Sequence, residues 1–478
     1  MRSIKFLIAS CCLVAVLQAA TLRAETQRPN VLFIPIDDLN HWVGHLGVHP
    51  QTKTPNMDRL AKIGVSFNKA YCAAPACNPS RIALMSGLRP STTGCYDNSQ
   101  DWRPTVSEDT LLNKTLLDAG YDCFGTGKIL HGSYGNSTKW TEFHKTNSGN
   151  MARHPSAPDD GVGGIKFSPL ANNDEDMPDY DAASYGIEIL NRKHDKPFFL
   201  AVGLVKPHLP FSVPKKWFDM FPLDSIQLPP HIEGDLNDVP AAGVRMAKPD
   251  GDHATMLKSG RWKEAVQAYL ATIAFCDAQV GRLVDALEQS AYRDNTIICL
   301  WSDHGWSLGE KEHWRKFALW EEPTRTVFIW KVPGLTPAGV QSPRPVDYMS
   351  IYPTLCALTS VEKPAHVEGL DISPLLKNPN ASWDVPALTT FHKDNHSFRS
   401  EQWRYIRYAD GSEELYDHQS DPNEWTNVAG ESKYAAVKAG FTEHIPAVNA
   451  PELPGGGESS EQSPQKKNNA KNKAKNKR

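Results

Sequence analysis

The chain has 478 residues, of which 40% are hydrophobic and 22% are charged, a composition typical of a globular protein with a large core. Of its 51 basic residues, three lie in the first 24 positions and seven in the last 13, so the body between them holds 41 basic against 55 acidic residues. This negative balance gives no support to a nucleic-acid partner, and any anionic ligand must be held by a local basic cluster.

Positions 1–24 have the pattern of a secretory signal peptide. Arg2 and Lys5 form a basic start, and an apolar run follows from Phe6 to Val16. That run is too short to cross a bilayer, and no other segment has the length and hydropathy of a membrane span. We therefore expect a secreted or periplasmic protein with no stable membrane insertion.

Strand and helix patterns alternate through the first three quarters of the chain. Apolar runs rich in β-branched and aromatic residues predict buried strands at 30–36, where Pro35 must lie near the strand end, and at 197–203 and 296–301. Apolar residues at helical spacing predict helices at 56–62, 111–119, 180–193 and 261–290. This alternation predicts an α/β fold with a mostly parallel sheet covered on both faces.

The composition changes after residue 377. Short alternating segments at 397–399, 403–408 and 414–417 predict an antiparallel sheet, with a turn at 409–412. We interpret 25–377 as a catalytic domain, 378–450 as a smaller α+β subdomain, and 451–478 as a disordered tail that ends in a lysine-rich stretch.

One cysteine lies in a distinctive stretch, Cys77-Asn78-Pro79-Ser80-Arg81. Taken alone, Cys77 could be a buried structural cysteine in a proline-containing turn. Six further cysteines follow the predicted signal peptide, and an oxidising compartment permits disulfides among them, although their connectivity is not readable from the sequence.

Ionisable residues follow each of the three predicted strands. The first strand runs into Asp37-Asp38, the second into Lys206-Pro207-His208 and the third into Asp303-His304. Ligands of open α/β sheets collect beyond the carboxyl ends of the strands, so these segments are expected to form one site. Carboxylate oxygens suit a hard divalent cation such as calcium or magnesium, although Asp37-Asp38 alone would more often be a pair of solvated loop carboxylates.

The Cys77 stretch, followed by Ser86-Gly87, resembles the C-x-P-S-R signature of the type I sulfatases, in which a Thr-Gly turn usually comes next. The resemblance covers about residues 28–428 and is nearest to the iduronate-2-sulfatase-like branch. It rests also on segments 54–61, 127–131, 206–211, 302–310 and 410–417. The resemblance implies an alkaline-phosphatase-like sandwich, with a large mostly parallel sheet flanked by helices and a C-terminal antiparallel sheet.

The resemblance also implies a modified nucleophile. In this family the cysteine is oxidised to formylglycine by a formylglycine-generating enzyme, and the aldehyde hydrate has two hydroxyls on one carbon. One hydroxyl would take the sulfate and the other would expel it as the carbonyl reforms, which divides one difficult displacement into two easier steps. Asp37, Asp38, Asp303 and His304 would bind one cation, expected to be Ca²⁺, together with an oxygen of modified Cys77.

The remaining roles are carried over from the family residue by residue. Arg81 would orient the diol, Lys128 and Lys316 would hold sulfate oxygens, and His131 would accept a proton when sulfate is expelled. His208 would protonate the leaving oxygen or bind sulfate. Taken alone, Lys128 would be a surface lysine and His131 a loop histidine, and Arg315 could take the place of Lys316.

The leading hypothesis is hydrolysis of a sulfate ester on a sulfated carbohydrate. The same superfamily includes phosphonate and phosphodiester hydrolases that use a modified cysteine, so that activity is the first alternative. If Cys77 stays unmodified, a carbohydrate-binding protein without catalysis is the second. The sequence names neither the sugar nor the position of its sulfate.

Overall fold

A computed structural model describes residues 28–132, 138–146 and 160–455. The predicted signal peptide and the lysine-rich end of the predicted tail lie outside these described residues. Within them, no helix combines the length and apolar character that a membrane crossing requires. The seven cysteines in these ranges are all buried and free, so no disulfide links them.

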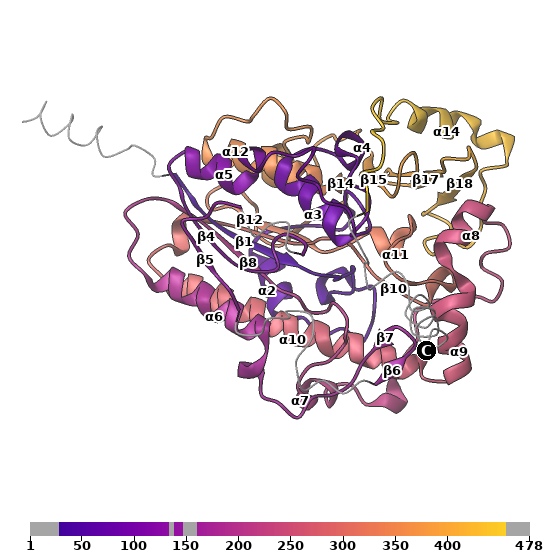
Figure 1. The fold of residues 1–478 in the computed structure, drawn as a ribbon, viewed down its shortest axis with the longest axis horizontal. Helices are drawn as coiled ribbons and strands as arrows, with labels where there is room; N and C mark the ends of the chain where they lie inside the picture. The colour runs from indigo at the N-terminus through magenta and orange to yellow at the C-terminus, as the bar shows by residue number, and fades with distance from the viewer. Residues whose placement is uncertain (1–27, 133–137, 147–159, 456–478) are drawn as a thin grey trace, which may run out of the picture.

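An eight-stranded sheet forms the centre of the molecule (Figure 1). Its strands pair in the order β13-β2-β12-β9-β1-β8-β4-β5. Their bounds are β1 Asn30–Ile36, β2 Val65–Phe67, β4 Asp122–Gly127, β5 Glu142–His144, β8 Phe198–Gly203, β9 Thr296–Ser302, β12 Phe328–Lys331 and β13 Val340–Ser342. Pairing is parallel except at β12, which runs antiparallel to both β9 and β2, so the predicted mostly parallel sheet is confirmed.

Strand β1 lies in the middle of this sheet, between β8 and β9. All seven of its residues are buried, and successive side chains enter opposite cores: Leu32 and Ile34 pack on one face, Val31 and Phe33 on the other. Burial on both faces explains why the sequence shows an unbroken apolar run rather than alternation. Pro35 lies next to the end of the strand, as predicted.

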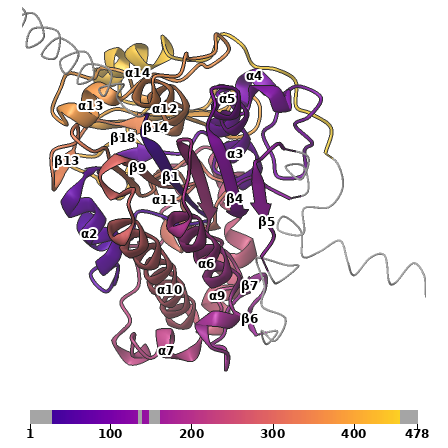
Figure 2. The same cartoon turned by 90° about the vertical axis from the view of Figure 1, so that its left-hand side faces the viewer.

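Helices cover both faces of the sheet (Figure 2). Helices α2 Pro55–Ile63, α6 Pro178–Asn191 and α10 Trp262–Gln289 pack on one face. Helices α3 Cys77–Ser86, α5 Leu112–Asp118 and α12 Ile351–Thr359 pack on the other. The predicted helices that correspond to α2, α5, α6 and α10 are confirmed within two residues at each end.

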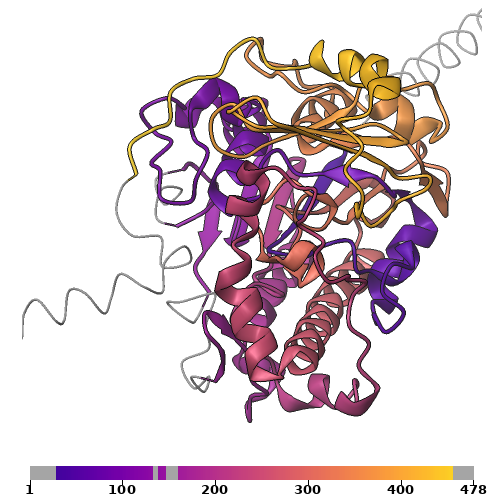
Figure 3. The same cartoon turned by 90° about the vertical axis from the view of Figure 1, so that its right-hand side faces the viewer.

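The C-terminal part forms a second, smaller sheet (Figure 3). Its four strands pair antiparallel in chain order: β15 Ala387–Thr390, β16 His396–Arg399, β17 Trp403–Arg407 and β18 Glu413–Asp417. Helix α14, Ala435–Thr442, packs against this sheet through Phe441, which contacts Phe398 and Tyr405. The predicted antiparallel C-terminal sheet is therefore confirmed, with β15 as a strand that the sequence pattern did not predict.

Short elements complete the connections. The helices are α4 Pro90–Thr93, α7 Lys215–Phe218, α8 Ala241–Ala247, α9 Ala254–Ser259, α11 Glu321–Thr324 and α13 Ser373–Lys377. The two-residue strands form the pairs β3 Ala70–Tyr71 with β14 Val346–Asp347, β6 Gly161–Val162 with β7 Ile165–Lys166, and β10 Ser307–Leu308 with β11 Trp314–Arg315. The β10–β11 hairpin matters for the site because Lys316 follows it directly.

Candidate active site

Two neighbouring parallel strands bring four ionisable residues together. Ile36 at the end of β1 pairs with Ser302 at the end of β9, so the residues that follow each strand emerge side by side. The backbone N–H of Asp38 donates to Oδ1 of Asp303 at 3.1 Å. Asp38 has a φ of 63°, a left-handed conformation that aspartate tolerates better than most residues. The turn it makes allows Asp37 and Asp38 to face one site.

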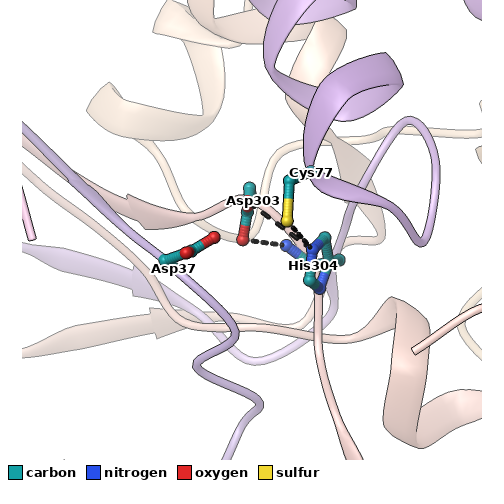
Figure 4. A group of neighbouring side chains, drawn as sticks. All are labelled: Asp37, Cys77, Asp303 and His304. Atoms are coloured by element: carbon teal, nitrogen blue, oxygen red, sulfur yellow. Dashed lines mark hydrogen bonds and ion pairs between the residues drawn. The ribbon is translucent and has the colours of Figure 1, made fainter. Parts of the chain in front are cut away.

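Cys77 is the first residue of α3 and is fully buried. Its Sγ lies 3.0 Å from Nζ of Lys316, 3.3 Å from Nε2 of His304 and 3.6 Å from Nζ of Lys128. Figure 4 shows the sulfur directed toward His304, with Asp37 and Asp303 beside it. The cysteine of the sequence motif therefore lies inside the cluster that follows the two strands.

Arg81 lies one helical turn after Cys77 on α3 and has no exposed surface. Its guanidinium donates to Oδ2 of Asp303 at 2.8 Å and to Oδ1 of Asp37 at 3.2 Å, and it also donates to three backbone carbonyls. These contacts join the ends of β1 and β9 to the helix that carries Cys77. In this arrangement Arg81 fixes the carboxylates as well as adding positive charge near the sulfur.

Three further basic residues complete the cluster. Lys128, which follows β4, forms an ion pair with Asp37. Lys316 donates to Oδ1 of Asp38 at 3.0 Å, whereas Arg315 points to Asp252, with Nε 2.5 Å from Oδ2. Nε2 of His208 lies 3.8 Å from Oδ2 of Asp38. Of the two candidate basic residues, Arg315 at the end of β11 and Lys316 directly after it, Lys316 is therefore the one at Cys77.

His131 is the predicted site residue whose role the described contacts do not support. Its Nδ1 is buried, and in the part of the chain that the structure describes it has no hydrogen-bond partner. No hydrogen bond or ion pair joins it to the Cys77 cluster within those ranges. Its proton-accepting role stays a prediction.

Burial and neighbouring charges shift the pKa values of the three carboxylates of the cluster in different directions. Burial would raise the pKa of Asp37, but the charges of Lys128, His208 and Arg81 outweigh it and hold that pKa well below its ordinary value. Burial raises the pKa of Asp38, and it raises the pKa of Asp303 to about 7 against the opposing charge of Arg81. A divalent cation beside Asp38 and Asp303 would favour their ionised forms.

The side chains fit a cation. Among the residues that the structure describes, no donor makes a hydrogen bond to the buried Oδ2 of Asp38, and its ion-pair contact with Nε2 of His208 is 3.8 Å long. Single ligand atoms from Asp37, Cys77, Asp303 and His304 lie within 4.8 Å of one another. Three carboxylates in one buried cluster supply the oxygen-rich ligand set that calcium and magnesium prefer.

One buried carboxylate near the site was not predictable from the sequence pattern. Asp179, in the first turn of α6, is 2% exposed and accepts the backbone N–H groups of Val205 and Lys206, both at 2.8 Å. In the sequence it directly follows Pro178, a position typical of a helix start. Its partner appears only when α6 packs beside the end of β8.

The comparisons with known proteins agree with this geometry. The family model described as Sulfatase matches residues 29–361, and the model described as N-sulphoglucosamine sulphohydrolase, C-terminal, matches residues 309–450. A sulfatase from Formosa agariphila is 39% identical over 90% of this chain and 88% of its own length. Human iduronate 2-sulfatase is 28% identical over 75% of this chain and 74% of its own length.

Solved structures show the same fold. Phosphonate monoester hydrolase of Agrobacterium radiobacter superposes with a TM-score of 0.73 and 24% identity, covering 87% of this chain and 95% of its own. A protein solved in complex with its substrate D-glucosamine-2-N,6-O-disulfate gives a TM-score of 0.69 and 21% identity, covering 88% of this chain and 97% of its own. These likenesses confirm the alkaline-phosphatase-like fold. The match of the Sulfatase family model to residues 29–361 and the 39% identity to the Formosa agariphila sulfatase lead to one conclusion: the chain belongs to the sulfatase family.

Proposed function

We propose that this protein hydrolyses a sulfate ester on a sulfated carbohydrate, with Cys77 converted to formylglycine and one Ca²⁺ as its cation. The observation that carries the proposal is the position of Sγ of Cys77, between Lys316 and His304 and in one cluster with Asp37 and Asp303. Sγ lies where a hydroxyl of the modified residue would lie. The hydrated aldehyde would supply a nucleophilic hydroxyl and a second hydroxyl for releasing sulfate.

The cation site in this proposal consists of Asp37, Asp38, Asp303 and His304, with an oxygen of the modified residue. The bound cation would supply positive charge against the oxygens of the sulfate group. Arg81 holds Asp37 and Asp303 in place, as its hydrogen bonds to both carboxylates indicate. These contacts support Arg81 as a residue that orients the nucleophile and its neighbours.

Lys128 and Lys316 are proposed to hold sulfate oxygens. Their ammonium groups lie 3.6 Å and 3.0 Å from Sγ of Cys77. The sulfate group would have to approach the side chain of residue 77, so it would come close to both ammonium groups. Fixed positive charge in a buried site stabilises the negative charge of the transition state more strongly than in water. His131 is proposed to take the proton of the second hydroxyl, and His208 to act on the leaving oxygen.

A carbohydrate substrate is supported by the relatives. Iduronate is a sugar acid, and the solved neighbour described above holds a disulfated glucosamine. The N-terminal pattern supports export from the cytoplasm, and a formylglycine-generating enzyme is the maturation partner that the proposal needs. The local basic residues of the site, set in a negatively charged body, would select the sulfate group at short range.

A phosphonate or phosphodiester hydrolase is the second candidate, because a phosphonate monoester hydrolase has the same fold at a TM-score of 0.73. The match of the Sulfatase family model to residues 29–361 favours the sulfate ester. Parallel assays of the matured protein with 4-nitrophenyl sulfate and bis(4-nitrophenyl) phosphate separate the two. We expect the higher kcat/KM with the sulfate; a higher value with the phosphate diester would replace the proposal by its alternative.

A further inference from the structure

Two buried charged residues beside the site have no part in the chemistry proposed above. Asp179 is 2% exposed and Lys206 is 3% exposed. Burial raises the pKa of Asp179 to about 6 and lowers the pKa of Lys206 to about 8, against the attraction between the two groups. Buried charges of this kind reduce stability unless they are hydrogen-bonded. The hydrogen bonds of Asp179 and Lys206 therefore indicate the role of each residue.

Asp179 holds the chain where it leaves β8. Its Oδ1 accepts the backbone N–H of Val205 and its Oδ2 accepts that of Lys206, both at 2.8 Å. One carboxylate therefore fixes two successive peptide groups just before His208. An ionised acceptor makes each of these bonds stronger than one between neutral groups.

Lys206 holds the same loop from the other side. Its Nζ donates to the backbone carbonyl of His208 at 3.2 Å and to that of Pro210 at 2.6 Å. The ammonium thus joins the two ends of a three-residue turn. Together, Asp179 and Lys206 bond to the backbone before, at and after His208.

The turn fixes the orientation of the His208 ring. Nδ1 of His208 lies 2.6 Å from the carbonyl oxygen of Leu209, which can only accept, so Nδ1 carries a proton. Nε2 is the ring atom left for the site, where it lies 3.8 Å from Oδ2 of Asp38 and 4.0 Å from Oδ2 of Asp37.

We propose that Asp179 and Lys206 are positioning residues that hold the His208 ring with Nε2 toward the leaving oxygen of the substrate. This inference rests on the proposed sulfatase function and selects one of the two roles given to His208. As the bond from sulfur to the leaving oxygen breaks, its electron pair stays on that oxygen, which takes the Nε2 proton and leaves as an alcohol. The new bond to sulfur comes from the hydroxyl of residue 77.

The test uses the dependence of the rate on the leaving group. Phenol needs a proton as it leaves more than 4-nitrophenol does, so loss of a general acid slows phenyl sulfate more than 4-nitrophenyl sulfate. We expect D179N and K206M to lower kcat/KM for phenyl sulfate by about tenfold or more beyond any loss with 4-nitrophenyl sulfate, within the range that general acid catalysis supplies. H208Q measures the full loss of kcat/KM for phenyl sulfate when the imidazole is absent. Adding D179N to H208Q should lower that value little further.

Asp277 provides a matched control. It is also buried, burial raises its pKa to about 6, and it accepts the backbone N–H groups of Asn56 and Met57 at the start of α2. D277N should reduce stability as D179N does, because it disturbs an equivalent pair of hydrogen bonds. We expect D277N to leave the ratio of the two kcat/KM values unchanged.

Nitrogen-15 spectra of histidine-labelled protein give a second readout that needs no turnover. In unmodified wild-type protein, His208 should have a protonated Nδ1, and D179N and K206M should shift its ring signals while D277N does not. Equal losses with both aryl sulfates, or unchanged His208 signals in D179N and K206M, would overturn the inference. Shifted signals in a protein that cleaves no sulfate ester would support the positioning and refute the proposed function instead.

Discussion

Two buried clusters of charge lie in this molecule, and they use their carboxylates differently. The interface cluster consists of Tyr71, Glu321, Arg399, Arg404, His418 and Glu424, between the large sheet and the C-terminal sheet. Each of the four carboxylate oxygens of Glu321 and Glu424 accepts a hydrogen bond. At Cys77, by contrast, Oδ2 of Asp38 accepts none from the described part of the chain.

The difference separates a structural network from a ligand site. Ligand atoms of Glu321, His418 and Glu424 also lie within 4.8 Å of one another, so proximity alone would make them a metal site. Their carboxylate oxygens already accept hydrogen bonds from Arg404, Tyr71 and the backbone N–H of Glu321, and a cation would have to displace these donors. Unused bonding capacity in a buried carboxylate, rather than closeness of acidic residues, distinguishes the Cys77 cluster.

The largest predicted effect comes from removing the proposed nucleophile of the Cys77 cluster. C77A should lower turnover of 4-nitrophenyl sulfate on the order of 10⁶-fold, the scale of loss when a hydrolase loses its nucleophile. The carboxylates remain in this variant, so calcium binding measured by calorimetry should persist. C72A is the matched control, because Cys72 is equally buried but contacts a backbone carbonyl instead. Turnover retained in C77A would contradict the assignment.

The next largest effect is a loss of stability when the interface cluster is disrupted. R404M should lower the free energy of unfolding by about 3–5 kcal/mol, because it leaves Glu321 and Glu424 buried with less compensating charge. The exposed ion pair between Arg245 and Asp410 supplies the control: R245M should cost less than about 1 kcal/mol. Urea unfolding measures both values, and equal losses would show that the interface cluster has no special structural role.

Calcium should distinguish the two clusters directly. At a calcium concentration about 100 times Kd, bound metal should stabilise the protein by about 2.7 kcal/mol relative to EDTA. D38N should lose most of this gain, because it replaces the carboxylate oxygen that has no hydrogen bond. E424Q should keep the gain although it starts from a less stable protein. The comparison fails if E424Q loses the calcium effect and D38N keeps it.

The smallest effect concerns pH. Burial would raise the pKa of Glu321, but Arg399, His418 and Arg404 outweigh it and hold the pKa well below its ordinary value, and the pKa of Glu424 is also lowered. A carboxylate with a lowered pKa stabilises the fold fully above its unfolded-state pKa of about 4.3, and this contribution is lost as pH falls toward the folded-state pKa.

The stability advantage of wild type over E424Q should therefore be constant above about pH 5 and shrink as the pH falls below about 4.3. Each unit of pKa difference corresponds to about 1.4 kcal/mol. Urea unfolding of both proteins at several pH values measures the advantage. An advantage that grows with acidity would mean that Glu424 is not held as an ion pair.

Strand ends and one motif made most of the Cys77 cluster predictable. Asp37, Asp38, Asp303 and His304 follow apolar runs long enough to be recognised as strands, and parallel strands bring such residues to one edge. The family resemblance added Lys128 and Lys316, and it supplied the role of His208, which follows the second predicted strand. Asp179 was missed because a carboxylate that accepts backbone N–H groups leaves no pattern in the sequence.

Other features depend on tertiary packing. Strand β4, with the sequence DCFGTG, has two glycines and an aspartate, residues that are depleted in strands, and it forms because β5 and β8 pair with it on either side. The choice between Arg315 and Lys316 also required the structure, since the backbone has a positive φ at Arg315 and Phe317. That local conformation turns Arg315 toward Asp252 and Lys316 toward Cys77.

Mass spectrometry of residue 77 in catalytically active protein tests the central claim most directly. Trypsin releases residues 70–81 as one peptide that contains both Cys72 and Cys77. We predict a peptide lighter by one sulfur and two hydrogens and heavier by one oxygen, with only Cys72 open to alkylation. An active protein whose peptide has the unmodified mass and takes up two alkyl groups would contradict the account.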